Sequence, residues 1–191
     1  MILEIAKYPD PILRAKGKKI AKITGEIREL AANMIETMND ARGVGLAAQQ
    51  VSVPLQLAVL DVTKSEDRPS TMSIDGKEVE LSEWMPMVLL NPELTLGKER
   101  ETGNEGCLSF PELTGEIDRP ASVTATGQLL RAGTREYDGE KITFHATGLL
   151  ARALQHEADH LNGILFIDRM NSATKLSIQG KLKRMQRDAE R

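Results

Sequence analysis

The chain has 191 residues, of which 40% are hydrophobic and 28% charged, and its net charge is −3. This balance excludes intrinsic disorder of the whole chain, because enough apolar surface is available to form a core. The slightly acidic charge also excludes a protein-wide basic surface of the kind that binds DNA. The length suggests one domain, or one domain with an appendage.

The single cysteine, Cys107, cannot form an internal disulfide, so the chain shows no sign of an oxidising compartment. Residues 1–10 carry charge and proline too early for a secretory signal. No apolar run approaches the roughly 18–20 residues of a membrane span. We therefore expect a cytoplasmic protein without a membrane partner.

The first element in chain order is a helix over about 25–41, because apolar residues recur there at steps of three and four. Asn39, Asp40 and Gly43 are expected to end it. A strand is predicted over 55–62.

Residues 63–83 are polar, and Asp75-Gly76 within them is typical of a tight hairpin turn, since both residues tolerate positive φ. We interpret this segment as a solvent-exposed excursion on the surface.

Short strands follow at 87–90 and 121–126, and a pair joined by Asp138-Gly139 ends in the strand 142–145. Turns between short strands favour antiparallel pairing over βαβ units. A second helix runs from about Gly148 to Asn162 and ends at Asn162-Gly163. The expected fold is α+β, with a core helix surrounded by small antiparallel sheets.

The last segment, 172–191, carries six basic residues and two acidic ones, a net charge of +4. We expect a helical extension (172–191) of a catalytic domain (1–171). Its apolar residues Ile178, Leu182 and Met185 could pack on that domain, and its basic residues could contact phosphates.

The segment His156-Glu-Ala-Asp-His160 places two histidines one helical turn apart, where both can bind one metal ion. They continue the apolar stripe of Leu149 and Ala153, so they point inward. Glu157 lies beside this stripe, within reach of a water on the metal. The third histidine, His145, is predicted on a strand and is not expected to be a ligand.

This spacing alone also suits a zinc protease, whose third ligand lies downstream. Here Phe166 stands at that position, and no later carboxylate lies in a convincing ligand context. The third ligand is therefore expected upstream, and Cys107 in Glu105-Gly-Cys-Leu-Ser109 is the candidate. A nucleophilic cysteine is the alternative interpretation, but it leaves the two histidines unexplained.

A third motif is Gly43-x-Gly45-x-Ala47-Ala48-x-Gln50. Its glycines allow close approach of a ligand or another strand, and a glutamine amide can donate to a developing oxyanion. Alone, the motif is more typical of a glycine turn that enters a strand.

Together these three motifs, in this order, resemble those of the peptide deformylase family, and Lys7-Tyr-Pro-Asp-Pro-Ile-Leu-Arg14 resembles its N-terminal segment. The resemblance covers residues 1 to about 170. It implies hydrolysis of the formyl group from N-formylmethionine at the start of newly synthesised polypeptides, with release of formate.

The resemblance also implies a role for each matching residue. The metal ligands would be Cys107, His156 and His160, with Fe(II) as the expected ion and Ni, Co or Zn as substitutes. Glu157 would be the general acid/base. Gln50 and the backbone N–H of Leu108 would bind the formyl oxygen.

By similarity to the family, the substrate would lie as an added strand paired with the backbone at Val44 and Gly106, and Gly45 would also belong to the substrate site. Its methionine side chain would contact Leu149 and Ala153. Those five residues complete the implied substrate site.

The resemblance also pairs Arg119 with Glu105 and suggests that the basic C-terminal segment contacts the ribosome. Departures from the family pattern are Gln49, Ser52, Gln56 and the length of 63–83.

Two other functions remain as alternatives at this stage. An endopeptidase would share the two histidines and Glu157, although Phe166 disfavours it. A regulatory metal-binding protein would need neither Glu157 nor Gln50.

Overall fold

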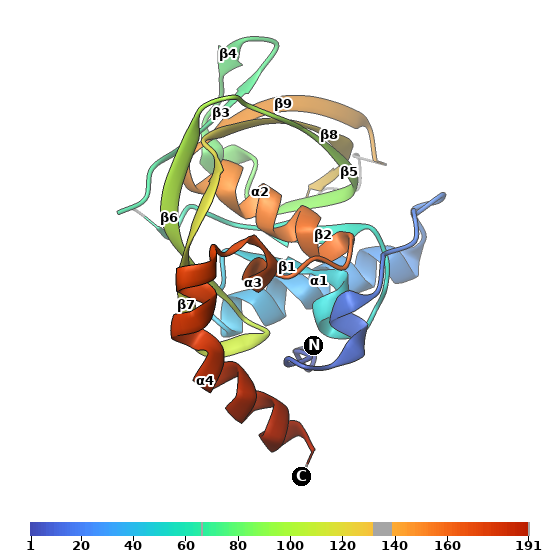
Figure 1. The fold of residues 1–191 in the computed structure, drawn as a ribbon. Helices are drawn as coiled ribbons and strands as arrows, with labels where there is room; N and C mark the ends of the chain where they lie inside the picture. The colour runs from blue at the N-terminus through green and yellow to red at the C-terminus, as the bar shows by residue number, and fades with distance from the viewer. Residues whose placement is uncertain (66, 132–138, 191) are drawn as a thin grey trace.

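The computed structural model describes residues 1–65, 67–131 and 139–190. Its helices are α1 (Gly25–Asp40), α2 (Gly148–Leu161), α3 (Phe166–Arg169) and α4 (Ser172–Ala189) (Figure 1). Its strands are β1 (Gly45–Ala47), β2 (Leu57–Leu60), β3 (Ser70–Ile74), β4 (Lys77–Glu78), β5 (Met87–Leu96), β6 (Arg100–Cys107), β7 (Phe110–Pro120), β8 (Ser122–Arg131) and β9 (Lys141–Thr147). Short 3₁₀ turns η1 (Pro11–Arg14), η2 (Ala48–Val51) and η3 (Leu81–Glu83) lie between them.

Seven strands form one sheet in the order β1-β2-β5-β8-β9-β3-β4, and β6 and β7 form a separate two-stranded sheet. Neighbouring strands in both sheets pair antiparallel. The predictions of an α+β fold and of antiparallel pairing are confirmed.

The strand β2 and the first four residues of β5, Met87–Leu90, are buried on both faces of the large sheet. Ala58 and Leu60 face the helix α2, whereas Leu57 and Val59 face α1. Successive side chains of a strand point to opposite faces, so these strands form continuous apolar runs in the sequence.

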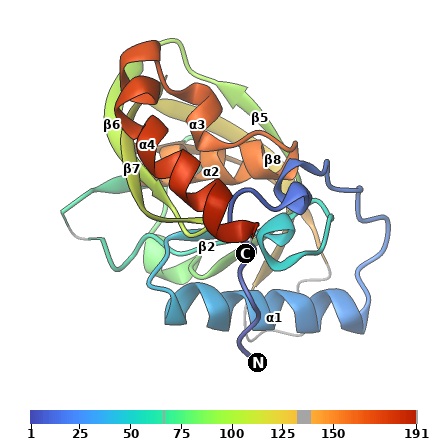
Figure 2. The same ribbon diagram turned by 60° about the horizontal axis from the view of Figure 1, so that its bottom comes forward.

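Helix α2 lies at the centre of the molecule, enclosed by the large sheet and the β6–β7 hairpin, whereas α1 covers the outer side (Figures 1 and 2). The helix α1 begins where the Thr24 side chain accepts a hydrogen bond from Ile27 N (3.4 Å). The helix α2 ends before Gly163, whose φ of +72° allows the chain to turn. Both predicted helices are confirmed.

A third apolar cluster joins the N-terminal segment, β7, α3 and α4. Ile178 of α4 is buried in it, and Leu182 and Met185 pack against it. The C-terminal segment therefore packs on the body through the three apolar residues that the sequence suggested. None of the helices described by the structure has the length and apolarity needed to cross a membrane.

The prediction for residues 63–83 was wrong in part. The turn at Asp75-Gly76 is confirmed, with φ of 51° and 75°. However, β3 pairs with β9 and its Met72 is fully buried in the core cluster that includes α2, so this part belongs to the sheet. A single buried methionine among polar residues gives no periodic signal.

The β6–β7 hairpin was not predicted, because its glycines and charged residues lack the alternation of a typical strand. In the turn predicted at Asp138-Gly139, Asp138 lies outside the described residues. Gly139, which precedes β9, has a φ of 79°.

Candidate metal centre

The site is built on one face of α2. Leu149, Ala153, His156 and His160 are buried along this face, as expected for residues spaced by three and four on a helix. The histidine rings lie with centroids 5.0 Å apart. The helix thus presents both imidazoles on the same side.

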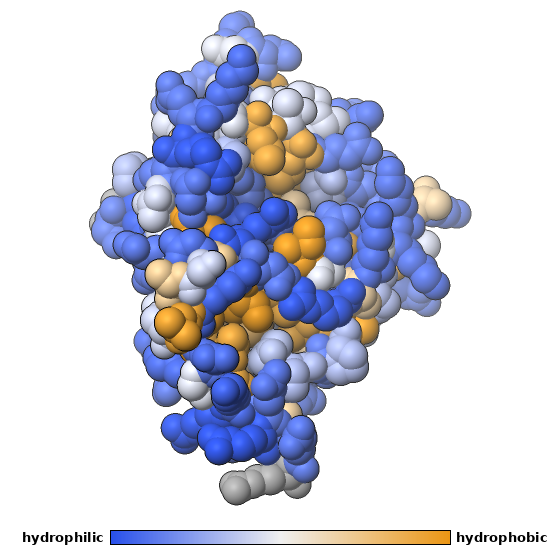
Figure 3. Space-filling model, in the orientation of Figure 1, coloured by the Kyte–Doolittle hydropathy of each residue, from blue (hydrophilic) through white to orange (hydrophobic). Residues whose placement is uncertain are grey.

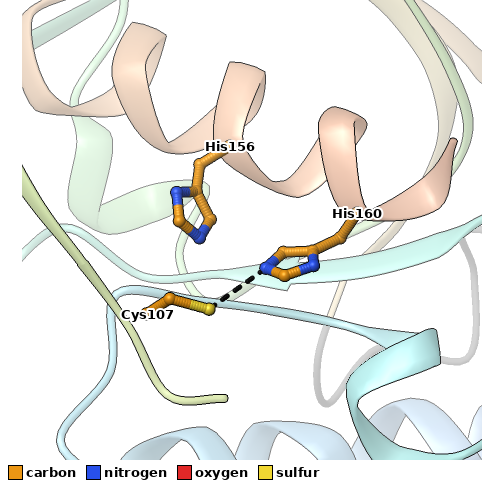
Figure 4. A group of neighbouring side chains, drawn as sticks. All are labelled: Cys107, His156 and His160. Carbon is orange, nitrogen blue, oxygen red and sulfur yellow. Dashed lines mark hydrogen bonds between the residues drawn. The ribbon is translucent and has the colours of Figure 1, made fainter. Parts of the chain in front are cut away.

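Cys107 reaches the two histidines from the end of β6 (Figure 4). One possible ligand atom from each of the three residues lies within 4.8 Å of the others, and Cys107 Sγ is 3.3 Å from His160 Nε2. One sulfur and two imidazole nitrogens are a donor set that suits Zn, Fe, Ni or Co and leaves a fourth position for water. The residues therefore fit a single catalytic metal ion.

The orientation of His156 is fixed by Glu105, whose Oε2 lies 3.0 Å from His156 Nδ1. This contact directs the other nitrogen of the ring toward Cys107 and His160, an arrangement typical of metal-binding histidines. Arg119 donates to both carboxylate oxygens of Glu105 at 2.6 and 3.0 Å, and Arg152 donates to Oε1 at 2.9 Å.

The network continues from Arg119 to Asp159 at 2.8 Å, and from Asp159 to Arg169 at 2.6 Å. The family resemblance implied the pair of Arg119 and Glu105, whereas Arg152 and Asp159 were not predicted. The aspartate of the His-Glu-Ala-Asp-His segment was the available signal. It lies one residue before His160, on the side of the helix that faces Arg119.

Burial and charge give these groups unusual proton affinities. Burial opposes ionisation of Glu105, but hydrogen bonds from His156 and Arg119 outweigh it and lower the pKa of this carboxyl to about 2. Burial is the main cause that lowers the pKa of His160 well below its usual value, with nearby positive charge such as that of Arg119 adding to it, and this keeps the imidazole neutral. A neutral imidazole is the form that binds a metal ion.

Glu157 points into the same space without being part of the ligand group. Burial raises the pKa of its carboxyl to about 7. Its Oε2 is buried and has no hydrogen-bond partner among the described residues. A carboxyl with a pKa near neutrality can both accept and donate a proton at physiological pH.

Glu157 lies against Gly45 of β1. A Cβ atom at Gly45 would be 2.8 Å from Glu157 Cδ and closer still to Oε1, so the glycine makes room for this carboxylate. This contact explains one glycine of the third motif, because the close approach comes from the side chain of the proposed acid/base.

Gln50 is buried beside Cys107. Its Oε1 accepts from Ala47 N (2.9 Å), and its Nε2 donates to Ser109 Oγ (3.1 Å) and lies 3.6 Å from Cys107 Sγ. The amide is therefore oriented with its donor group toward the cysteine.

Leu108 follows Cys107 in the turn between β6 and β7, and its carbonyl accepts from Lys7 Nζ (2.6 Å). Backbone bonds from Ala6 N to Gln50 O (2.8 Å) and from Tyr8 N to Ser109 O (2.9 Å) hold the N-terminal segment against both regions. The N-terminal segment thus fixes the two predicted oxyanion donors relative to each other.

A cavity of about 540 Å³ opens on this centre, a size typical of ligand sites. Its lining brings together all but one of the residues predicted for the site, namely Val44, Gly45, Gln50, Gly106, Cys107, Leu108, Leu149, Ala153, His156 and Glu157. The exception, His160, lies beneath the cavity and is 1% exposed. In Figure 3 the surface is mostly hydrophilic, with small hydrophobic patches toward the middle of the face.

The remaining sequence predictions fall outside this cavity. His145 is exposed on β9 and has no place in the ligand group. Gln56, a departure from the family pattern, donates to Leu161 O (2.9 Å) and so ties β2 to the end of α2. Ser52, another of these departures, takes a left-handed conformation with φ of 63°.

The chain is similar to known proteins over nearly its whole length. The family model described as polypeptide deformylase matches residues 2–176. The chain is 43% identical over 185 residues to the peptide deformylase of Opitutus terrae, covering 96% of this chain and 92% of that protein. It is also 43% identical over 187 residues to that of Methylacidiphilum infernorum, covering 98% and 94%.

Solved structures are similar as well. The crystal structure of a mutant of Arabidopsis thaliana peptide deformylase 1B has a TM-score of 0.80 and 34% identity, covering 98% of this chain and 91% of that chain. The peptide deformylase of Ehrlichia chaffeensis has a TM-score of 0.80 and 32% identity, and all of both chains is covered.

Proposed function

The chain belongs to the peptide deformylase family, metal-dependent hydrolases that remove the N-formyl group from nascent polypeptides, and from this premise we propose how its own residues carry out the reaction. The observation that carries the proposal is the meeting of Cys107, His156 and His160 beside Glu157 in one cavity. Formate is the product released.

Cys107, His156 and His160 would hold one divalent ion. Fe(II) is the ion that we propose, with Ni, Co or Zn able to replace it, because all four accept mixed sulfur and imidazole ligands. When bound, the ion supplies Lewis acidity and an activated water for attack on the formyl carbon.

Glu157 would act as the general acid/base. Its carboxyl, with a pKa near 7, takes the proton that the attacking water loses and passes it to the nitrogen of the breaking C–N bond. Gln50 Nε2 and Leu108 N–H would donate to the formyl oxygen as negative charge develops there. Each such donor is worth about 3 kcal/mol in other hydrolases.

The substrate backbone would add a strand between two free strand edges. β1 ends the large sheet, and β6 pairs only with β7 among the described strands. Val44 O already accepts from Asp61 N (2.9 Å), and the alternation of an antiparallel strand turns the backbone groups of Gly45 toward the open edge. We therefore propose Gly45, in place of Val44, as the residue that pairs with the substrate. Pairing with Gly45 and Gly106 would align the peptide whatever its sequence, while Val44, Leu149 and Ala153 line the space for the methionine side chain.

The test is formate release from a formyl-Met peptide by anaerobically prepared protein, with the metal content measured on the same sample. We expect formate in proportion to bound metal. The variant His160→Asn should lose both the bound metal and formate release. His145→Asn is the matched control and should keep both the metal and the activity. One bound ion per chain without formate would favour a regulatory metal protein, and cleavage inside a peptide would favour an endopeptidase.

We also propose that residues 172–191 are a basic extension of the catalytic domain 1–171 and contact the ribosome. Lys183 and Arg187 are exposed on α4, and neither has an ion pair among the described residues. Ile178 packs α4 into the apolar cluster of the catalytic domain, so deleting α4 would also disturb that domain. Reversing exposed charges on α4 is therefore the cleaner test. The double variant Lys183→Glu/Arg187→Glu should lose ribosome cosedimentation and keep deformylation of a free peptide; unchanged cosedimentation would exclude this contact. Since the substrate is a nascent polypeptide, we propose the cytoplasm as the location.

A further inference from the structure

The outer part of the active-site cavity carries an excess of positive charge. Its exposed ionisable residues are Lys7, Arg42, Arg68 and Glu112, whereas the other charged residues of the lining are buried in the metal centre and its network. Three cations and one acid at this mouth contrast with the net charge of −3 for the whole chain.

Arg42 is held at the mouth by a fixed turn. It has a φ of 55°, its N–H donates to Asn39 O (3.1 Å), and the next residue, Gly43, donates to Met38 O (2.9 Å). This turn closes α1 and leads directly into β1. The backbone of Arg42 is therefore fixed beside the proposed substrate strand, and its side chain extends from this fixed point.

Arg68 is held at the same cavity by the segment between β2 and β3. The next residue, Pro69, accepts a hydrogen bond from Leu149 N (3.3 Å), and Ser70 Oγ accepts from Leu150 N (2.9 Å). These bonds attach the segment to the first turn of α2. Arg68 consequently stands next to Leu149, one of the residues proposed to contact the methionine.

Both arginines lack an ion-pair partner among the described residues, and both are exposed. Lys7 differs from them, because its ammonium is engaged by Leu108 O. The residues of a substrate that follow its methionine must pass this mouth as they leave the cavity. Two cations there that have no ion-pair partner in the described part of the chain would attract carboxylates and repel basic side chains.

We propose that Arg42 and Arg68 make this enzyme selective for formylated chains that carry acidic side chains at the two positions after methionine. The inference rests on the proposed deformylase function and names its preferred substrate class. The contacts would be solvent-exposed charge pairs, so the preference would be moderate and would weaken as salt screens it.

The experiment compares kcat/KM for formyl-Met-Glu-Glu-Ser and formyl-Met-Gln-Gln-Ser within each protein, by formate release at low and high ionic strength. At low salt we expect the unmodified enzyme to favour the glutamate peptide about threefold to tenfold. The double variant Arg42→Gln/Arg68→Gln should bring this ratio close to one. The variant Arg42→Lys/Arg68→Lys, which keeps both positive charges, should retain much of the preference for the glutamate peptide.

The control is Lys183→Gln/Arg187→Gln, which also removes two positive charges, but from α4, where neither residue lines the cavity. It should keep the ratio of the unmodified enzyme. A ratio of one or less in the unmodified enzyme, or an unchanged ratio in the double arginine variant, would overturn the proposal.

Two further readouts separate this proposal from the function itself. Turnover of the glutamine peptide by the unmodified enzyme tests deformylation whatever the ratio. If the double arginine variant turns over neither peptide, the proposal is tested by product inhibition of the unmodified enzyme. Met-Glu-Glu-Ser should then inhibit more strongly than Met-Gln-Gln-Ser, because the same charge preference applies to the product. Equal inhibition by the two peptides would contradict the proposal.

Discussion

Glu157 combines two properties that rarely occur together in a residue kept for stability. It is 4% exposed, and one of its carboxylate oxygens has no partner among the described residues. Burying an unsatisfied polar group costs free energy of folding. Such a cost at a cavity is typical of a residue retained for chemistry.

We therefore expect Glu157→Gln to lower kcat by a factor on the order of 10² to 10⁴, the usual contribution of a general acid/base. The metal content should not change, because Glu157 is not in the ligand group. Formate release and metal analysis on one sample measure both quantities. Glu116→Gln, an exposed site on β7, is the control, and a Glu157→Gln enzyme with normal kcat would refute the acid/base role.

Gly45 allows a second prediction for a single residue. A methyl group there would overlap the carboxylate of Glu157, whose Cδ would be only 2.8 Å away, so Gly45→Ala should push this group aside. Since catalytic groups misplaced by about 1 Å can cost 10²-fold in rate, kcat should fall by roughly that factor while the metal remains bound.

The matched control is Gly25→Ala, because a Cβ atom at Gly25 has no neighbour within 4 Å. Thermal melts of the two variants should differ little, whereas their kcat values should differ strongly. If Gly45→Ala turned over as fast as Gly25→Ala, the contact between Gly45 and Glu157 would have no catalytic importance.

Among the elements, α2 and the β6–β7 hairpin depend on each other. Cys107 comes from the hairpin and both histidines come from the helix, so the proposed metal site forms only where the two meet. The buried network of Glu105, Arg119, Arg152 and Asp159 joins them.

Removing the central guanidinium of this network should loosen the joint. Arg119→Met breaks three buried hydrogen bonds, two to Glu105 and one to Asp159. We expect a loss of about 3 kcal/mol in the free energy of unfolding, at the low end for a broken buried ion pair, because Arg152 and Arg169 still neutralise these acids.

Urea unfolding of metal-free protein measures this loss without a contribution from metal binding. The control is Arg100→Met in the same hairpin, where Arg100 pairs with Asp118 on the surface and about half of each side chain is exposed. That change should cost less than about 1 kcal/mol. Equal losses in the two variants would show that the buried network adds no more stability than the surface pair.

The elements that sequence predicted well are those with local signals. α1 and α2 carry apolar residues at helical spacing, and His156 and His160 share a face for the same reason. The hairpin was missed because its stability comes from partners distant in sequence, such as Arg152 with the carbonyls of Glu101 (2.8 Å) and Ile117 (3.0 Å). Periodicity cannot reveal such contacts.

For the whole molecule, the metal site should act as a cross-link between regions far apart in the chain. Cys107 is separated from His156 by 49 positions, and the three proposed ligands would connect β6 with α2. An ion that binds only the folded chain stabilises it according to its concentration relative to Kd, by about 2.7 kcal/mol at 100 times Kd. For a chain of this size each kcal/mol shifts Tm by roughly 2–4 °C.

Chelation of the metal should therefore lower Tm by roughly 5–10 °C under those conditions. Calorimetry with and without chelator measures the shift. In Cys107→Ser, which retains the fold but weakens the ligand set, the chelator should change Tm little. Only a site that includes Cys107 predicts that the chelator shifts the Tm of the unmodified protein more than that of Cys107→Ser. If the chelator shifts Tm equally in both proteins, the stabilising ion is bound somewhere other than at Cys107, His156 and His160.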